Sequence, residues 1–377
     1  MNINKKQIIR AFFVVFVRIS PIVGAVLGLI IGGIFVLLWN EMPGVYMLEL
    51  FKGSFGSATK IGATLNRTTP LMLAGLGTAI AWKAGAINIG QEGQLFVGGL
   101  GAGVVSFWVA DFPPMVALPL SLLGGVVFGM LLASIAALMR LYNGIHEILT
   151  TLLLNFIGVL FTSFMVSTVI TDPITSGIPQ TPVFPESTWM PVWKGLGNTH
   201  AGIAIAIILA LAGGYMLWFT PLGFKFRMAG FSPKATRASG YSPNRIFVTG
   251  MLISGGLSGL AGAVEVLSSI YHRLQYGFGT GLGFDSLAVA LLANTNPFGV
   301  LPSSLFFGGL RAGMLSMQRA MGVPAVLLQI VQGSIILFIV IGFAVGNSKT
   351  LQKQLRAAEI EDLDAAQPVA KTKSKSA

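Results

Sequence analysis

Apolar runs long enough to cross a lipid bilayer dominate this chain. Met115–Met139 contains no charged residue, and Ile246–Ile270 contains one, Glu265. A membrane-spanning helix needs about 20 predominantly apolar residues. Because the runs are continuous rather than alternating, they predict helices and not a membrane β-barrel. Only 10% of the residues are charged, against about 25% in soluble domains. The sequence therefore predicts an all-α polytopic membrane protein.

About ten transmembrane helices are predicted, including short broken ones, with both termini cytoplasmic. The segments are Ile19–Trp39, Pro70–Trp82, Gln94–Ala110, Met115–Met139, Ile145–Ile170, Ala201–Phe219, Ile246–Ile270, Phe284–Ala293, Val300–Leu315 and Ala325–Val345. They predict a transmembrane domain over residues 18–346, preceded by a cytoplasmic N-terminus over 1–17. The tail over 347–377 is charged and poor in apolar residues, which favours a disordered cytoplasmic segment.

Basic residues set the predicted orientation. The loop over 220–245 has five cations and no acidic residue, so it is placed in the cytoplasm. The loop over 171–200 is rich in Pro, Thr and Ser, holds two tryptophans, and is placed outside. Cations of two other segments then fall outside, against the positive-inside rule, and the helix parity across 284–320 stays open. These cations are Lys52, Lys60, Arg67, Arg311 and Arg319.

One stretch, Lys83–Gln94, places polar residues and glycines between two apolar flanks. A polar break at membrane depth is tolerated only where protein covers the backbone or where it lines a wet cavity. The stretch therefore predicts a broken helix pair at a translocation pathway, with an ordinary cytoplasmic loop as the alternative. Leu95–Gly103 resembles Leu305–Gly313, and each follows a break containing Asn, which indicates an internal repeat.

Polar residues inside apolar segments are candidates for a substrate pathway. The predicted pathway residues are Lys83, Asn88, Gln91, Glu92, Gln94, Asn155, Glu265, Asp285, Asn294 and Asn296. Amides donate and accept hydrogen bonds without requiring an opposite charge, which favours a neutral polar solute such as a sugar or nucleoside. Structural roles are the alternatives: a helix cap is favoured for Asp285, interhelical bonding for Asn155 is equally supported, and Lys83 could pair with Glu92.

Several kinds of chemistry are excluded or disfavoured. No Gly-Lys pair occurs, so no P-loop for nucleotide hydrolysis exists, and the protein is predicted not to be an enzyme. The chain has no cysteine, and its three histidines lack paired spacing, so no metal site is expected. The net charge of +11 gathers at membrane ends, which indicates topology and anionic lipid rather than nucleic acid.

Four stretches resemble permease subunits of bacterial ABC importers for purine nucleosides and simple sugars, within the ribose and branched-chain amino acid permease superfamily. They are Ala84–Gln94, Gly144–Asn155, Thr220–Gly240, and Gly283–Ala293 with Asn296–Gly299. Lys83 stands where the family commonly has Arg, and His146 stands where it commonly has Asn. The resemblance covers about Leu71 to Gly342.

The resemblance implies a multi-pass protein of the inner or plasma membrane that has no cofactor of its own. Its implied partners are ABC ATPase subunits that use ATP, a second permease subunit in a homo- or heterodimer, and an external solute-binding protein. Without the resemblance, the basic loop fits equally a surface helix or a helix docked in a partner. With it, the ATPase-coupling residues are Gly223, Arg227, Gly230, Lys234, Ala235, Arg237 and Gly240. The alternative function is a proton-coupled secondary transporter using Glu92 or Glu265.

Overall fold

The computed structural model describes residues 20–34, 37, 43–174, 177–268, 272–322 and 324–346. The chain divides into two compact units, Val36–Leu328 and a smaller unit made of Met1–Phe35 with Gln329–Ala377. Each unit is described by itself. The predicted cytoplasmic N-terminus over 1–17 and the predicted tail over 347–377 lie outside the described residues.

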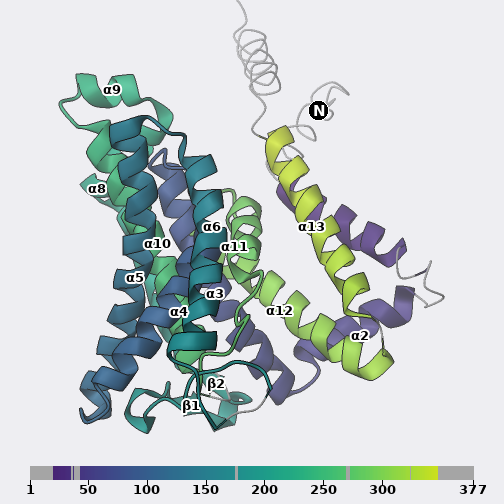
Figure 1. Cartoon of the computed structure of the whole chain (residues 1–377). Coiled ribbons are helices and arrows are strands. Elements are labelled where there is room, and N and C mark those ends of the chain that lie inside the picture. Colours follow the sequence, from purple (N-terminus) through teal and green to yellow (C-terminus); the bar gives the residue numbers. More distant parts are fainter. Residues whose placement is uncertain are drawn as a thin grey trace, which may run out of the picture. The chain divides into compact units, whose positions relative to one another are not determined.

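The larger unit is built almost wholly from helices (Figure 1). Its main helices are α2 (Pro43–Phe55), α3 (Ala58–Lys83), α4 (Gln91–Trp108), α5 (Pro114–Asn143), α6 (Glu147–Phe164), α7 (Gly202–Phe219), α8 (Pro221–Phe231), α9 (Pro233–Ala238), α10 (Pro243–Leu267), α11 (Leu282–Leu292) and α12 (Pro297–Met321). A π-helical turn, Met165–Val169, extends α6. Between α6 and α7 lie two short 3-10 helices (Glu186–Thr188 and Lys194–Leu196) and an antiparallel pair, β1 (Val192–Trp193) with β2 (Thr199–His200).

Five helices in the described part are long and apolar enough to cross a membrane: α5, α6 with its π turn, α7, α10 and α12. Along α6, the side chains of Leu149, Leu153, Phe156 and Leu160 are exposed at helical spacing. In water such a stripe would be unfavourable, whereas hydrocarbon tails solvate it. The protein is a multi-pass membrane protein. The number of spans and the orientation of the ends stay predictions.

The helix before the polar break is longer than the sequence indicated. The prediction of a short span over Pro70–Trp82 is wrong, because α3 is one helix of 26 residues. Thr68, Thr69 and Thr78 each donate a hydroxyl hydrogen bond to the carbonyl four residues earlier. A hydroxyl bonded in this way is satisfied without water, so the threonines do not end the helix. At about 39 Å, α3 is long enough to span a bilayer.

The two ends of α3 meet the two loops that the sequence placed on opposite sides of the membrane. Near its start, Gly62 lies against the backbone of Gly197 in the predicted external loop. At its end, the Lys83 carbonyl lies against Gly230 of α8 in the predicted cytoplasmic loop. The loops therefore lie at opposite ends of one helix, as the basic-residue pattern requires. We name the two ends after the predicted sides of these loops, the external and the cytoplasmic end.

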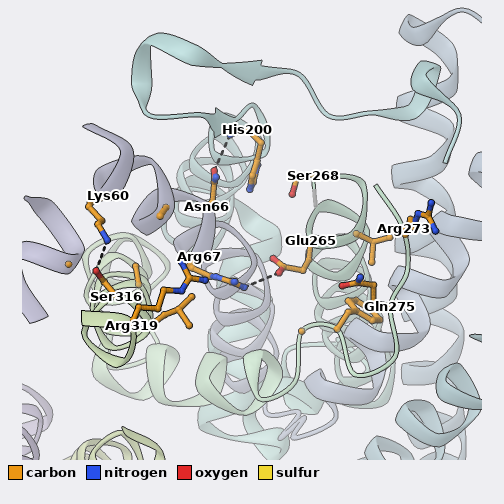
Figure 2. A pocket seen from close by; sticks show the side chains of 17 residues that line it. Lys60, Asn66, Arg67, His200, Glu265, Ser268, Arg273, Gln275, Ser316 and Arg319 are labelled. Carbon is orange, nitrogen blue, oxygen red and sulfur yellow. Dashed lines mark hydrogen bonds and ion pairs between the residues drawn. The ribbon is translucent and has the colours of Figure 1, made fainter. Parts of the chain in front are cut away.

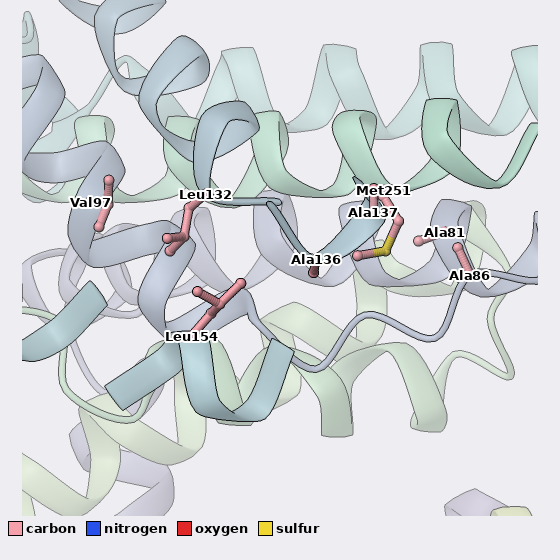
Figure 3. Close-up of a cluster of buried hydrophobic side chains, with 8 residues drawn as sticks. All are labelled: Ala81, Ala86, Val97, Leu132, Ala136, Ala137, Leu154 and Met251. Atoms are coloured by element: carbon pink, nitrogen blue, oxygen red, sulfur yellow. The ribbon is translucent and has the colours of Figure 1, made fainter. Parts of the chain in front are cut away.

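Glycines let the backbones of α4, α5 and α10 approach closely. A Cβ atom on Gly259 of α10 would overlap the carbonyl oxygen of Gly125 in α5, and one on Gly98 of α4 would overlap Gly259. Lipid tails are as apolar as leucine, so close van der Waals packing, rather than the hydrophobic effect, holds membrane helices together. The nearby apolar cluster (Figure 3) uses mostly small or medium side chains: Ala81, Ala86, Val97, Leu132, Ala136, Ala137, Leu154 and Met251.

In the smaller unit, the helix Ser20–Ile34 packs against the part of α13 (Ala325–Gly346) that begins at Gln329. Gly24 and Gly28 lie one above the other at four-residue spacing. They meet the backbone of Phe338 and Ile335, respectively. This contact is a second example of helix pairing through a glycine face.

We predict that Gly259→Ala lowers the free energy of unfolding by about 1–3 kcal/mol, since the added methyl group must push α5 away from α10. The measurement is the thermal unfolding midpoint of the purified protein in detergent. Gly333→Ala in α13 is the matched control, because a Cβ there meets nothing within 4 Å. A midpoint for Gly259→Ala equal to that of the control would contradict the close helix crossing.

Candidate functional site

The polar break between α3 and α4 is held together by its own amides. Asn88 and Gln94 exchange two side-chain hydrogen bonds of 2.9 and 3.2 Å. Asn88 also donates to the Ser254 hydroxyl of α10 at 3.0 Å, and Gln91 donates to the same oxygen at 3.2 Å. All four side chains are buried. The amides therefore join the break to α10 and do not line the described cavities.

Helix α6 covers the break from another side. The Asn155 amide accepts from the backbone N–H of Gly93 and donates to the carbonyl of Ile89, both at 2.8 Å. The Thr151 hydroxyl accepts from the N–H of Ile89 at 3.3 Å. Side chains of α6 thus satisfy backbone groups that a broken helix leaves unpaired. Interhelical bonding, one of the alternatives for Asn155, is what the structure shows.

Glu92 joins the two broken helices. It lies in the first turn of α4, and its carboxylate accepts from the backbone N–H groups of Gly281 at 2.6 Å, Gly283 at 2.7 Å and Phe284 at 3.4 Å. These N–H groups stand at the start of α11, which has no side-chain cap of its own. A carboxylate at a helix N-terminus satisfies unpaired donors and complements the helix dipole. Glu92 thus caps α11 from a helix almost 190 residues earlier in the chain.

This arrangement corrects two interpretations of the sequence. Asp285 does not cap α11; its carboxylate instead accepts from Nε of Arg311 in α12 at 2.5 Å. Among the described ion pairs none joins Lys83 to Glu92, because both Glu92 oxygens face α11. Arg311 also donates to the Thr280 carbonyl at 3.3 Å. The start of α11 is therefore held by α4 on one side and by α12 on the other.

A cavity of about 460 Å³ opens at the external end of the larger unit (Figure 2). Its walls come from α2, α3, α10, α12, His200 and the segment 273–279. That segment continues to Gly281, whose backbone N–H donates a hydrogen bond to Glu92. The cavity therefore adjoins the start of α11, where the two broken helices meet. Cavities of roughly 300–1,000 Å³ suit small organic ligands.

Charged side chains make up half of the polar residues that line the cavity. Arg67 of α3 donates to Glu265 of α10 at 3.2 Å, and Lys60 donates to the Ser316 hydroxyl at 2.5 Å (Figure 2). Arg273 pairs with Asp172 at 3.0 Å, and Arg319 also lines the wall. The cavity therefore carries more positive than negative charge.

Of the predicted pathway residues, all of which the structure describes, Glu265 alone lines this cavity. Asn88, Gln91, Glu92, Gln94 and Asn155 form the buried network beside it. A partial signal for the residues that were missed lay in the charge pattern, because Lys60, Arg67 and Arg319 are three of the five cations that violated the positive-inside rule. The other two, Lys52 and Arg311, do not line the cavity.

The other broken region lies between α11 and α12. Asn294 and Thr295 adopt positive φ values of 51° and 54° there. Asn296 caps α12 by accepting from the N–H of Phe298 at 3.2 Å, and it also accepts from the Trp218 indole at 3.2 Å. The predicted break is confirmed, and its asparagines serve the turn and the cap.

At the cytoplasmic end, α8 and α9 form the basic loop. Lys234, Ala235 and Arg237 of α9 are exposed, whereas Thr236 is buried. Gly223 lies against the carbonyls of Met216 and Leu217. The remaining predicted coupling residues are Arg227, whose guanidinium lies 4.8 Å from the Trp218 ring, Gly230, which touches the Lys83 carbonyl, and Gly240, which has a positive φ of 80°. Helix α9 thus presents an exposed face and follows directly on α8, which contacts the end of α3.

We predict that Glu92→Ala speeds amide hydrogen exchange at Gly281, Gly283 and Phe284, since their shared acceptor disappears. Each hydrogen bond to a charged acceptor stabilises by about 1.5–3 kcal/mol, so the unfolding midpoint should also fall. Hydrogen exchange with mass spectrometry is the measurement. Glu186→Ala in the predicted external loop is the control, and unchanged exchange over 281–284 in Glu92→Ala would refute the cap.

A second prediction concerns acid stability. Burial lowers the pKa of the His200 imidazole from 6.5 to about 4, so the folded protein holds this side chain neutral. Between these values the unfolded chain binds the extra proton, and stability falls as the pH drops from 6.5 towards 4, by roughly 3 kcal/mol in total. Thermal unfolding midpoints from pH 7.5 to 4.5 should therefore decline less steeply in His200→Gln than in the unsubstituted protein. Equal slopes would argue against a buried neutral imidazole.

Comparison with known proteins gives a class of membrane protein, in agreement with the apolar helices described above. Residues 61–340 match the family model described as "Branched-chain amino acid transport system / permease component". The chain is 33% identical to the guanosine ABC transporter permease protein NupP of Bacillus subtilis, over 86% of this chain and 93% of that protein.

Two further relatives cover similar lengths. The nucleoside ABC transporter permease protein NupB of Lactococcus lactis is 30% identical over 90% of this chain and 95% of its own length. The glucose ABC transporter permease protein TsgB13 of Haloferax volcanii is 32% identical, over 85% and 86% respectively. Since both the family model and these relatives cover most of the sequence, the chain belongs to the family of branched-chain amino acid transport system permease components.

Proposed function

We propose that this protein is the membrane-spanning permease subunit of an ABC importer that carries nucleosides across the cell membrane. The similarity to the guanosine and nucleoside permeases over nearly the whole chain supports this most directly. The glucose permease among the relatives makes a simple sugar the second candidate solute. The chain has no P-loop, so the proposal places ATP hydrolysis in separate ATPase subunits.

The external cavity is the proposed entry site for the solute. It opens at the end of the unit opposite α8 and α9, where an external binding protein would deliver its cargo. It reaches down to segment 273–281, whose end is fixed by Glu92. A second permease subunit and the binding protein complete the pathway in this proposal, and the sequence leaves both homo- and heterodimers open.

The exposed face of α9 is the proposed contact with the ATPase subunits. Its lysine and arginine can dock into a groove of a partner, as short helices commonly do. A smaller cavity of about 300 Å³ separates α9 from the ends of α3 and α5, and Arg140 and Arg237 line it. Movement of α8 and α9 would therefore be transmitted to α3 through the contact between Gly230 and Lys83.

The proton-coupled alternative has weaker support. Both carboxylate oxygens of Glu92 already accept backbone hydrogen bonds from α11. If Glu92 carried the proton, each protonation of its carboxylate would have to break one of these bonds. Glu265 is already engaged in an ion pair with Arg67 at 3.2 Å. The hydrogen bonds and the ion pair of these carboxylates thus fit structural and recognition roles better than proton transfer.

We predict that the permease, reconstituted in liposomes with its ATPases and binding protein, takes up guanosine only with ATP, and that blocking the cavity stops uptake. The chain has no cysteine, so Ala63→Cys places a single thiol on the cavity wall. A bulky, membrane-impermeant thiol reagent added outside should abolish uptake by this variant.

Gly195→Cys is the matched control, since Gly195 is exposed outside the cavity and a Cβ there touches nothing. Labelled Gly195→Cys and the treated cysteine-free protein should transport normally. Uptake without ATPase subunits that a protonophore abolishes would refute the importer. Normal uptake by fully labelled Ala63→Cys would refute entry through this cavity.

A further inference from the structure

The ion pair between Arg67 and Glu265 is unusual because it stands on the wall of a cavity within membrane-spanning helices. It joins α3 to α10 at 3.2 Å, and its side chains are 41% and 20% exposed. A partly exposed ion pair contributes little as a link between two helices. Its exposure leaves both side chains open to a ligand in the cavity.

The pair retains most of its hydrogen-bonding capacity. Within the described residues, one hydrogen bond joins Arg67 Nη1 to Glu265 Oε1, and neither side chain makes another. A carboxylate offers about four acceptor sites and a guanidinium offers five N–H donors. The cavity therefore presents acceptors and donors side by side, fixed about 3 Å apart by the ion pair.

Glu265 is the one carboxylate among the residues that line this cavity as described. The other charged lining groups are the cations Lys60, Arg67, Arg273 and Arg319. A ligand that needs a charged hydrogen-bond acceptor on the wall must therefore use Glu265, whereas Gln275 and Ser268 offer neutral acceptors. Phe278, whose ring centroid lies 4.8 Å from that of Phe96, also lines the cavity and adds an apolar surface to it.

Two neighbouring hydroxyl groups fit this arrangement. Each hydroxyl of a cis-diol can donate its proton to a carboxylate oxygen and accept a hydrogen bond from a guanidinium N–H. The diol is neutral, so it leaves the charge of the ion pair balanced as it enters. At the pair itself, an anion would be repelled by Glu265 as well as attracted by Arg67, and a cation would meet the reverse, so a neutral ligand is the one that both partners can bind without opposition.

We infer that Arg67 and Glu265 recognise the ribose 2′,3′-diol of a nucleoside in the external cavity, so that the permease itself selects ribonucleosides. This rests on the proposed function, and it adds a selection step beyond that of the binding protein. A nucleoside without these hydroxyls leaves the pair unsatisfied in a partly dehydrated site, which weakens its binding.

The test compares guanosine with 2′,3′-dideoxyguanosine in the complete reconstituted importer, using the same binding protein throughout. Because that protein's own preference is identical in every sample, it cancels when variants are compared. Glu265→Gln should reduce the ratio of kcat/KM for guanosine to that for the dideoxy analogue by roughly tenfold, the effect of losing one charge-assisted hydrogen bond. Arg67→Gln should reduce it as well.

Glu49→Gln is the matched control, because it removes the carboxylate of an ion pair with Lys52 that lies outside the cavity. Its ratio should equal that of the unsubstituted protein. Equal losses for both nucleosides in Glu265→Gln would show that the pair only joins α3 to α10, which overturns the inference. Absence of any nucleoside uptake by the unsubstituted importer would instead overturn the proposed function.

A measurement on the unsubstituted importer covers the case in which Glu265→Gln fails to assemble. Saturation-transfer NMR with guanosine, in lipid nanodiscs without binding protein, should show the strongest transfer to the ribose H2′ and H3′ protons. The dideoxy analogue should compete with guanosine roughly tenfold less well. Transfer confined to the base, or equal competition by the two nucleosides, would overturn the inference.

Discussion

The larger unit depends on one carboxylate held between two helix N-termini. Glu92 begins α4 and accepts from the first N–H groups of α11, so the positive ends of two helix dipoles meet at the same side chain. Either helix alone would leave unpaired donors in a region without water. Asn88 and Gln94 then bond each other, and Asn155 accepts from the backbone N–H of Gly93 in α4. Backbone that would be unstable in lipid is thereby stabilised by protein.

Fold class was predictable from the sequence because a bilayer permits few structures. Continuous apolar runs predict helices, and the basic loop and the external loop do lie at opposite ends of α3. The extent of α3 was not predictable from polarity. The threonines of α3 made its first part resemble a solvent-exposed segment. Their hydroxyls instead donate hydrogen bonds to carbonyls of the same helix, so these hydroxyls are satisfied without water.

The site was less predictable than the fold, because the sequence does not show what a buried polar side chain will bind. Lys83–Gln94 does separate two helices, α3 and α4, but a buried amide can bond a solute or another amide, and sequence does not distinguish these uses. Here Asn88 and Gln94 bond each other. The cavity is lined instead by cations at external positions, together with Glu265. Their departure from the positive-inside rule was visible, but without the fold nothing showed that α3, α10 and α12 bring them together.

Transport requires the cavity and the cytoplasmic end to be coupled, and the described contacts form a continuous route between them. From exposed α9, the route runs through α8 and Gly230 to the end of α3, and then across the break to Glu92. Glu92 holds Gly281, the end of the segment that lines the cavity. Each contact involves backbone atoms or a carboxylate with fixed acceptor geometry, so little displacement would be absorbed by side-chain rotation. This series of contacts supports the proposed coupling between α9 and the segment that lines the cavity.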